Sequence, residues 1–240
     1  KLSLKDKMFV KFFNMCFNSV KKKADAIIMR SESAREEILK STNLDEDKVF
    51  VVSGGIDPNF FYPTKKKQHD KIRIGYKGGL DGRKNAKLLV EVFRKMVQKR
   101  DDIELHVAGS GANLEKFRNL KIPNAKFYGY IPIEKENEFL NSLDIFVYPT
   151  LGEGLGLPPL EAMACGVPVL ASNTTSMPEI VGGAGVITDP TFESFYKELW
   201  KLVENKQLRK KIAAICLKRA KTMTWKRTAE DSLKIYETII

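Results

Sequence analysis

Residues 148–166 read YPTLGEGLGLPPLEAMACG, and this stretch decides the fold. The apolar run at 145–148, which leads into it, is typical of a buried strand. A glycine-containing loop follows, and Pro158 and Pro159 suit the first turn of a helix, where a missing N–H group costs nothing. Helical spacing then continues, and Gly166 is a suitable stop. The stretch therefore predicts a strand, a glycine loop and a helix N-terminus, an arrangement that can bind an anion.

Two carboxylates lie within this stretch. Glu153 falls in the loop, and Glu161 lies one turn into the expected helix. Carboxylate oxygens accept hydrogen bonds, so two of them around an anion site suggest a ligand with hydroxyls on either side of a phosphate. The alternative is structural: Glu153 is solvated, and Glu161 only favours the helix dipole.

The sequence from Glu153 onward, EGLGLPPLEAMACGVPVLAS, resembles the E-x7-E signature of retaining glycosyltransferases of the GT-B fold, family 4 type. The resemblance implies that Glu153 contacts the donor sugar and that Glu161 binds the ribose of the nucleotide. It also implies that the loop between them meets the sugar and the diphosphate, through Gly154, Leu155, Gly156 and Leu157.

Composition is that of an ordinary globular protein. The 240 residues, 43% hydrophobic and 30% charged, suffice for one large domain or one and a half. No apolar run approaches the roughly 20 residues of a membrane-spanning helix, and no signal peptide is visible. Three widely spaced cysteines suit a reducing compartment. With two histidines a His-rich zinc site is excluded, and no metal site is expected.

The net charge of +11 favours acidic partners: nucleotide phosphates, an anionic membrane surface or nucleic acid. The lysines are spread along the chain without a nucleic-acid-binding motif, so nucleic acid is not expected. We predict a cytoplasmic location, with the cytoplasmic membrane face as an extension of that prediction.

The first residues differ in character from the rest. Apolar side chains from Met8 to Phe17 predict a helix, which leads to Lys21–Lys23, a strand at 26–29 and a helix at 33–40 preceded by Ser31. The resemblance implies that residues 1–47 are the tail of an N-terminal acceptor domain. A basic amphipathic helix on a membrane surface is the alternative.

Residues 48–222 are expected to form a Rossmann-like nucleotide-sugar-binding domain, and residues 223–240 a helix that crosses back to the N-terminal domain. Beyond a short strand at 49–52, strands and helices alternate, which predicts an α/β fold with a doubly wound parallel sheet. The expected strands are 72–77, 103–108, 126–130, 145–148, 167–171 and 185–188. The expected helices are 84–98, 112–119, 133–142, 158–164, 177–181, 192–204, 207–222 and 226–238. Ser176 and Glu179 predict a capping box.

A second glycine pair, Gly78-Gly79, follows the strand at 72–77, where open α/β sheets bind ligands. Arg83 and Lys84 come soon after, and a cation there could neutralise a diphosphate. A solvated basic turn is the commoner structure for such a pair. Relatives carry Arg at the position of Gly79; Lys84 keeps the place of the family lysine, and the resemblance implies that Arg83 supplies the missing charge.

Tyr130 lies in a segment that resembles the one whose backbone contacts the nucleobase. The sequence does not identify the base of the donor, which is expected to be of UDP or GDP type. The resemblance implies transfer of a sugar from a nucleotide-diphosphate donor with retention of configuration, to a glycan or lipid-linked acceptor held by the N-terminal domain. Glu153, Lys84 and Arg83 are the expected catalytic residues. No Asp-x-Asp pair is present, so no cofactor is expected.

Only the end of the N-terminal domain is expected in this chain, so we expect it to bind donor but to transfer sugar poorly or not at all by itself. Two alternatives remain. One is a GT-B relative that epimerises or phosphorolyses sugars. The other is a non-catalytic nucleotide-sugar-binding module or a fragment that docks on membranes.

Overall fold

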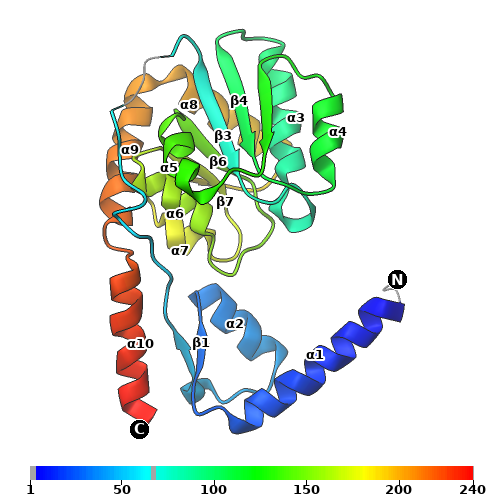
Figure 1. Ribbon diagram of the computed structural model, residues 1–240, viewed down its shortest axis with the longest axis vertical. Helices are drawn as coiled ribbons and strands as arrows, with labels where there is room; N and C mark the ends of the chain where they lie inside the picture. The colour runs from blue at the N-terminus through cyan, green and yellow to red at the C-terminus, as the bar shows by residue number, and fades with distance from the viewer. Residues whose placement is uncertain (1–3, 66–68, 240) are drawn as a thin grey trace.

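A six-stranded parallel sheet forms the centre of the computed structural model, which describes residues 4–65 and 69–239. Figure 1 shows the sheet in the upper part of the molecule, with helices around it. In sheet order the strands are β5 (Ala125–Gly129), β4 (Ile103–Ala108), β3 (Ile72–Lys77), β6 (Ile145–Tyr148), β7 (Val169–Ser172) and β8 (Val186–Thr188).

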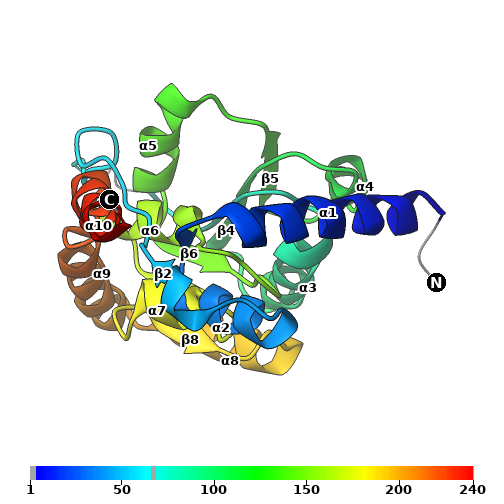
Figure 2. The ribbon, with the colours of Figure 1, turned by 90° about the horizontal axis from the view of Figure 1, so that it is seen from below.

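Helices cover both faces of this sheet, as Figure 2 shows from below. On one face α3 packs against α8, and on the other α6 packs against α9 and α5. The helices are α3 (Ala86–Val97), α4 (Asn113–Asn119), α5 (Ile133–Asn141), α6 (Leu157–Ala164), α7 (Met177–Val181), α8 (Phe192–Glu204) and α9 (Lys206–Ala220). The doubly wound parallel sheet predicted from the alternating pattern is therefore confirmed.

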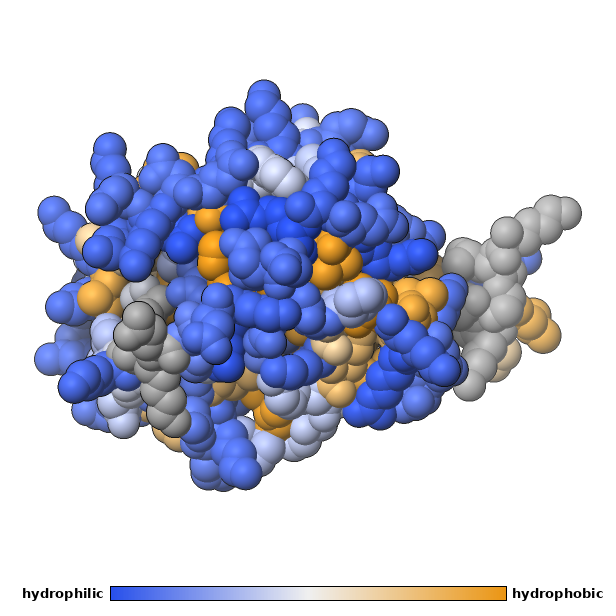
Figure 3. All heavy atoms as spheres, turned by 90° about the horizontal axis from the view of Figure 1, so that it is seen from above, coloured by the Kyte–Doolittle hydropathy of each residue, from blue (hydrophilic) through white to orange (hydrophobic). Residues whose placement is uncertain are grey.

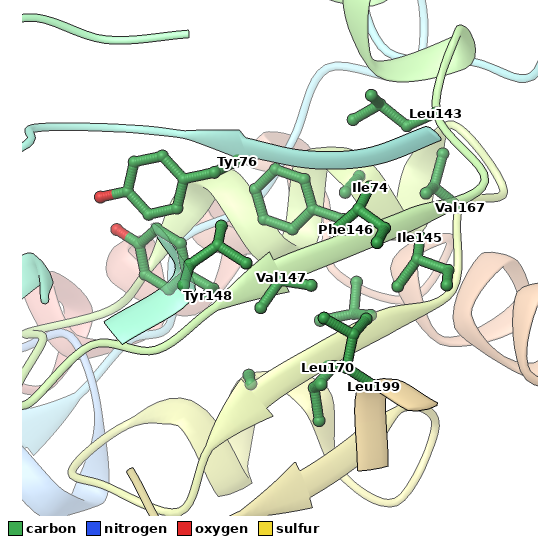
Figure 4. Packing of buried hydrophobic residues seen from close by; sticks show 14 of the residues in the cluster. Ile74, Tyr76, Leu143, Ile145, Phe146, Val147, Tyr148, Val167, Leu170 and Leu199 are labelled. Atoms are coloured by element: carbon green, nitrogen blue, oxygen red, sulfur yellow. The ribbon is translucent and has the colours of Figure 1, made fainter. Parts of the chain in front are cut away.

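The middle of the sheet is fully buried because its strands are continuous apolar runs. Every residue of β6 and β7 is buried, as is typical of parallel strands covered on both faces. Figure 4 shows Phe146, Val147 and Leu170 packed between the layers. This core fixes the carboxyl ends of β3 and β6, from which the loops of the candidate site emerge.

Strand order reverses direction between β3 and β6. From β3 the chain proceeds outward to β4 and β5, then returns to the other side of β3 as β6 and continues to β7 and β8. In open α/β sheets the crevice at such a switch point, beyond the carboxyl ends of the strands, is where ligands bind.

The remaining elements lie below the sheet in Figure 1. They are α1 (Leu4–Lys23), α2 (Glu32–Ser41), a short parallel pair formed by β1 (Ile27–Met29) and β2 (Val49–Val51), a 3₁₀ turn (Glu46–Lys48) and α10 (Trp225–Ile239). Ser31 is the N-cap of α2, as predicted, and its hydroxyl accepts a hydrogen bond from the Ala34 amide. Among the described helices none is long and apolar enough to cross a membrane.

Helix α1 presents its apolar side chains to solvent. The face of the molecule in Figure 3 is mainly hydrophilic, with small separate apolar areas. On α1, by contrast, Phe9 is 67% exposed and Phe12 is 61% exposed, and Met8, Phe13 and Met15 are exposed beside them. Figure 1 shows α1 running away from α10. The C-terminal helix therefore does not cover the apolar side chains of α1.

Three local predictions need correction. Helix α3 begins at Ala86 rather than at residue 84, because Asn85 adopts a left-handed conformation (φ 53°) between the helix and a preceding 3₁₀ turn, Gly82–Lys84. Strand β7 begins at Val169 rather than at residue 167, since Val167 still bonds back to α6. Most other boundaries agree within one or two residues.

The capping box predicted at Ser176 is the third correction. The Ser176 hydroxyl makes no cap bond to α7; it donates to the carbonyls of Leu155 and Glu153 instead. The Glu179 carboxylate bonds to the first amides of α2. Both side chains are drawn away from α7 by partners distant in sequence.

Candidate functional site

The loop that joins β6 to α6 and the turn after β3 are in contact at the switch point of the sheet. Gly156 is the N-cap of α6 at φ 91°, and a Cβ there would come within 2.1 Å of the Met177 side chain, so only glycine fits. Pro158 and Pro159 lie in the first turn of α6, as predicted. Glycine and proline residues in and beside residues 150–157 therefore favour this loop conformation. We call residues 150–157 the donor loop, after the role that the sequence resemblance implies for them.

Glu153 points into the site from this loop, and its side chain is only 6% exposed. Its Oε1 accepts a hydrogen bond of 2.8 Å from the Tyr148 hydroxyl and contacts the Nζ of Lys84. Its backbone N–H donates to the Thr175 hydroxyl at 2.8 Å. Glu153 is thus not solvated, which argues against the structural alternative considered from the sequence.

The two basic residues of the turn after β3 reach the donor loop in different ways. Lys84, 25% exposed, lies against Glu153 and Tyr148, with Nζ 3.1 Å from the Tyr148 hydroxyl. Arg83, 62% exposed, donates to the Gly152 carbonyl at 2.8 Å and has Nη1 3.4 Å from Oε2 of Glu153. The structure therefore brings together Glu153, Lys84 and Arg83, the three residues that the sequence nominated as catalytic.

Glu161 lies beneath this group on α6. Its carboxylate is largely buried, and Oε2 lies 2.7 Å from Nζ of Lys77, the last residue of β3. Burial raises the pKa of Glu161 above its ordinary value, although the nearby Lys77 acts in the opposite direction. The Glu161 carboxylate is therefore held in place by a cation at the end of β3, and 12% of its side chain is exposed.

The glycines after β3 differ in how much room they have. Gly78 has φ 150°, which other residues rarely adopt, and a Cβ on it would lie 3.1 Å from the Tyr76 hydroxyl. At Gly79 a Cβ would meet only Cγ of Lys84, at 3.7 Å. The position where relatives carry Arg therefore has space for a side chain.

Tyr130 lies apart from these residues. It follows β5 at the edge of the sheet, with β4 between β5 and β3, and it is 76% exposed. Gly154, Leu155 and Leu157 lie along the donor loop and the start of α6. Leu155 packs near Gly54 and Arg30, since a Cβ on Gly54 would come within 2.3 Å of Cδ2 of Leu155.

Sequence reasoning missed several residues of the site. Lys77 joins two carboxylates, Glu161 and Glu136, and a lysine at the carboxyl end of a strand, where open α/β sheets bind ligands, was the available signal. Tyr76 and Tyr148 stack with ring centroids 5.8 Å apart, and Figure 4 shows their hydroxyls pointing to the same side. Burial raises the pKa of both phenols, so Tyr148 stays protonated and donates to Glu153.

The chain thus has the fold of the C-terminal, Rossmann-like half of a GT-B glycosyltransferase, with polar residues gathered at its switch point. Residues 60–218 match the family model described as glycosyl transferases group 1. The chain therefore belongs to that family.

Known proteins of the family agree with this assignment. The chain is 36% identical over 115 residues to O-antigen chain mannosyltransferase B of Escherichia coli, covering 48% of this chain and 30% of that protein. It is 26% identical over 251 residues to a D-inositol 3-phosphate glycosyltransferase of Corynebacterium jeikeium, covering 94% of this chain and 60% of that protein. The chain thus spans less than two thirds of the length of each of these relatives.

A solved structure supports the fold. The Anabaena protein HepE, crystallised in complex with UDP and glucose, superposes with a TM-score of 0.81 at 16% identity, covering 94% of this chain and 66% of that one. At this identity the likeness extends to the fold alone.

Proposed function

We propose that this chain is the donor-binding part of a retaining glycosyltransferase that uses a nucleotide-diphosphate sugar, of UDP or GDP type. The observation that carries the proposal is the meeting of Lys84, Glu153 and the N-terminus of α6 at the switch point, with Glu161 behind them. Cations, backbone amides and carboxylates together match a ligand that alternates sugar hydroxyls with phosphates.

Each residue has a distinct role in the proposed reaction. Lys84, assisted by Arg83, neutralises the diphosphate as it leaves, and the first amides of α6 stabilise the same charge. Glu153 accepts hydrogen bonds from the sugar hydroxyls and orients the sugar. Glu161 binds the ribose. The roles are electrostatic and positional, so the proposal requires no metal.

The domain arrangement follows the same proposal. Residues 1–47 are the tail of an N-terminal domain that holds a glycan or lipid-linked acceptor, residues 48–222 bind the donor, and residues 223–240 cross back. Among the relatives above, the mannosyltransferase of O-antigen chains is consistent with a glycan acceptor. Transfer is expected to need the acceptor domain as well as this chain.

A panel of nucleotide sugars tests the proposal. Melting temperatures of the chain with UDP, GDP, UDP-glucose and GDP-mannose are expected to rise for one nucleotide series and to change little for the other. The longer protein is then expected to transfer the matching sugar with retention. Donor binding without transfer to any acceptor would favour a non-catalytic module, and epimerised or phosphorolysed donor would favour the other GT-B relatives.

A further inference from the structure

Glu179, on the short helix α7, bonds to a different helix. Its Oε2 accepts a 2.8 Å hydrogen bond from the N–H of Glu32, and its Oε1 accepts one of 2.8 Å from the N–H of Ser33. These amides belong to the first turn of α2, whose N–H groups have no partner within the helix. A carboxylate that spans two of them makes charge-assisted bonds and favours the helix dipole.

The same end of α2 contacts the donor loop. Ser31 is 2% exposed, and its hydroxyl accepts from the Ala34 amide at 3.1 Å while donating to the Gly154 carbonyl at 3.0 Å. One buried hydroxyl therefore caps α2 and holds the loop. The position of α2 and the position of Gly154 are linked through it.

The segment just before Glu179 also holds the donor loop. The Thr175 hydroxyl accepts from the N–H of Glu153, and the Ser176 hydroxyl donates to the Leu155 carbonyl, both at 2.8 Å. The Met177 side chain fills the space beside Gly156. The donor loop is thus held both by residues 175–177 and by Ser31.

Helix α7 is itself fixed to the sheet domain. Arg219, on α9, donates through Nε to the Ile180 carbonyl at 2.7 Å and contacts the Glu179 carbonyl. Its guanidinium occupies the notch at Gly182, where a Cβ would lie 2.1 Å from Cζ of the arginine. The Glu179 carboxylate therefore projects towards α2 from a helix that is held by α9.

We propose that Glu179 is a positioning residue that holds α2 on the donor loop, so that Ser31 fixes the loop where it meets the sugar of the donor. The inference rests on the proposed function for its effect on binding. Glu161, proposed to bind the ribose, is held by Lys77 and not by the residues of this linkage. Loss of Glu179 should therefore lower the affinity for nucleotide sugars more than the affinity for nucleoside diphosphates.

Glu179→Ala in the full chain is the main test. We expect its affinity for UDP-glucose or GDP-mannose, whichever the wild-type chain binds, to fall about tenfold, the effect of losing a charge-assisted hydrogen bond. Affinity for the corresponding nucleoside diphosphate should stay within about twofold. Glu179→Gln keeps one acceptor oxygen, so its affinity for the nucleotide sugar should lie between those of the wild type and Glu179→Ala. Glu193→Ala, an exposed first-turn glutamate of α8, is the matched control.

Hydrogen exchange reports on the linkage without any ligand. In Glu179→Ala the amides of Glu32 and Ser33 should exchange faster, and so should peptides covering residues 150–157. Ser31→Ala should accelerate the same loop peptides. In the double variant the loop peptides should exchange little faster than in either single variant, because both substitutions act on a single linkage.

Two outcomes would overturn the inference. If Glu179→Ala accelerates exchange at Glu32 and Ser33 but leaves residues 150–157 unchanged, the carboxylate only caps α2. If affinity for nucleoside diphosphate and nucleotide sugar falls equally, Glu179 does not act on the sugar end. A wild-type chain that binds none of the four nucleotides would contradict the proposed function, while the exchange experiment would still decide the linkage.

Discussion

Lys84 and Glu153 are in direct contact across the switch point, and the Tyr148 hydroxyl bridges them, 3.1 Å from Nζ and 2.8 Å from Oε1. The cation proposed to meet the diphosphate and the carboxylate proposed to meet the sugar therefore hold each other in place. Such an arrangement positions both charges in advance, which is what electrostatic stabilisation of a leaving group requires.

Replacing Lys84 by Ala should weaken the binding of nucleoside diphosphates more than that of monophosphates. The reason is that the lysine is proposed to contact the phosphate that carries the sugar in the donor. Arg83→Ala should have the same effect more weakly, since its guanidinium is 62% exposed. Calorimetric titration of UMP and UDP, or of GMP and GDP, measures both. A larger loss in Arg83→Ala would reverse this ranking. Lys87→Ala, an exposed lysine at the start of α3, serves as the control.

Substitutions of the two glutamates should affect the binding of different ligands. Glu161→Ala should weaken the binding of nucleotide and of nucleotide sugar alike, by about 1.5–3 kcal/mol for a lost hydrogen bond to a charged group. Glu153→Ala should mainly reduce discrimination among donor sugars. Titration of UDP and several UDP-sugars, or the guanine set, into both variants tests the division. Equal losses for all ligands in both variants would refute it.

The raised pKa of Glu161 predicts opposite effects of pH on binding and on stability. The carboxylate form accepts the ribose hydroxyls, so nucleotide affinity should decline on acidification at a pH above the range in which ordinary glutamates titrate. The protonated form costs less to bury, so Glu161 destabilises the fold progressively as pH rises through its raised pKa, and stability recovers on acidification. Glu161→Gln should remove this part of both profiles.

Gly79 offers a gain-of-function test. A Cβ there meets only the Lys84 side chain, at 3.7 Å, so Gly79→Arg should be accommodated and should restore the charge that relatives carry. We expect tighter binding of nucleoside diphosphate, by at most about 1.5–3 kcal/mol. Gly79→Gln adds length without charge and should not improve binding. Weaker binding by Gly79→Arg than by Gly79→Gln would show that this position does not face the diphosphate.

Helix α1 is expected to find a partner. Its exposed apolar side chains each forgo roughly 1.5–3 kcal/mol of burial, and patches of this kind usually bind something. We expect the chain to self-associate or to bind anionic vesicles through Lys21–Lys23. Deleting residues 1–23 should abolish whichever behaviour the intact chain shows by light scattering and vesicle flotation. Identical behaviour of the two proteins would mean that the helix is merely exposed.

The donor loop could be predicted because its determinants are local. Two prolines fix the first turn of α6, glycine fits the left-handed cap, and the apolar run at 145–148 is long enough only for a buried strand. The charges of Glu153, Lys84 and Arg83 were nominated by their motifs, and the parallel sheet brings them together at neighbouring strand ends.

The contacts that could not be predicted join residues far apart in the chain. Glu179 reaches Ser33 across 146 residues, and a local capping pattern at Ser176 gave the wrong partner because long-range acceptors and donors compete for both side chains. Likewise Lys77 and Glu161 meet only because β3 and β6 are neighbours in the sheet. Local pattern carries no information on such pairs.

The β3–β6 switch point is proposed to bind a nucleoside diphosphate. Titration of UDP and GDP into the wild-type chain and into Glu161→Ala measures this binding. One nucleotide should bind the wild type and, at about 100 times its dissociation constant, raise the free energy of unfolding by roughly 2.7 kcal/mol. Glu161→Ala should bind it more weakly. Absence of binding by both nucleotides at millimolar concentration, or equal binding by the two proteins, would contradict the account.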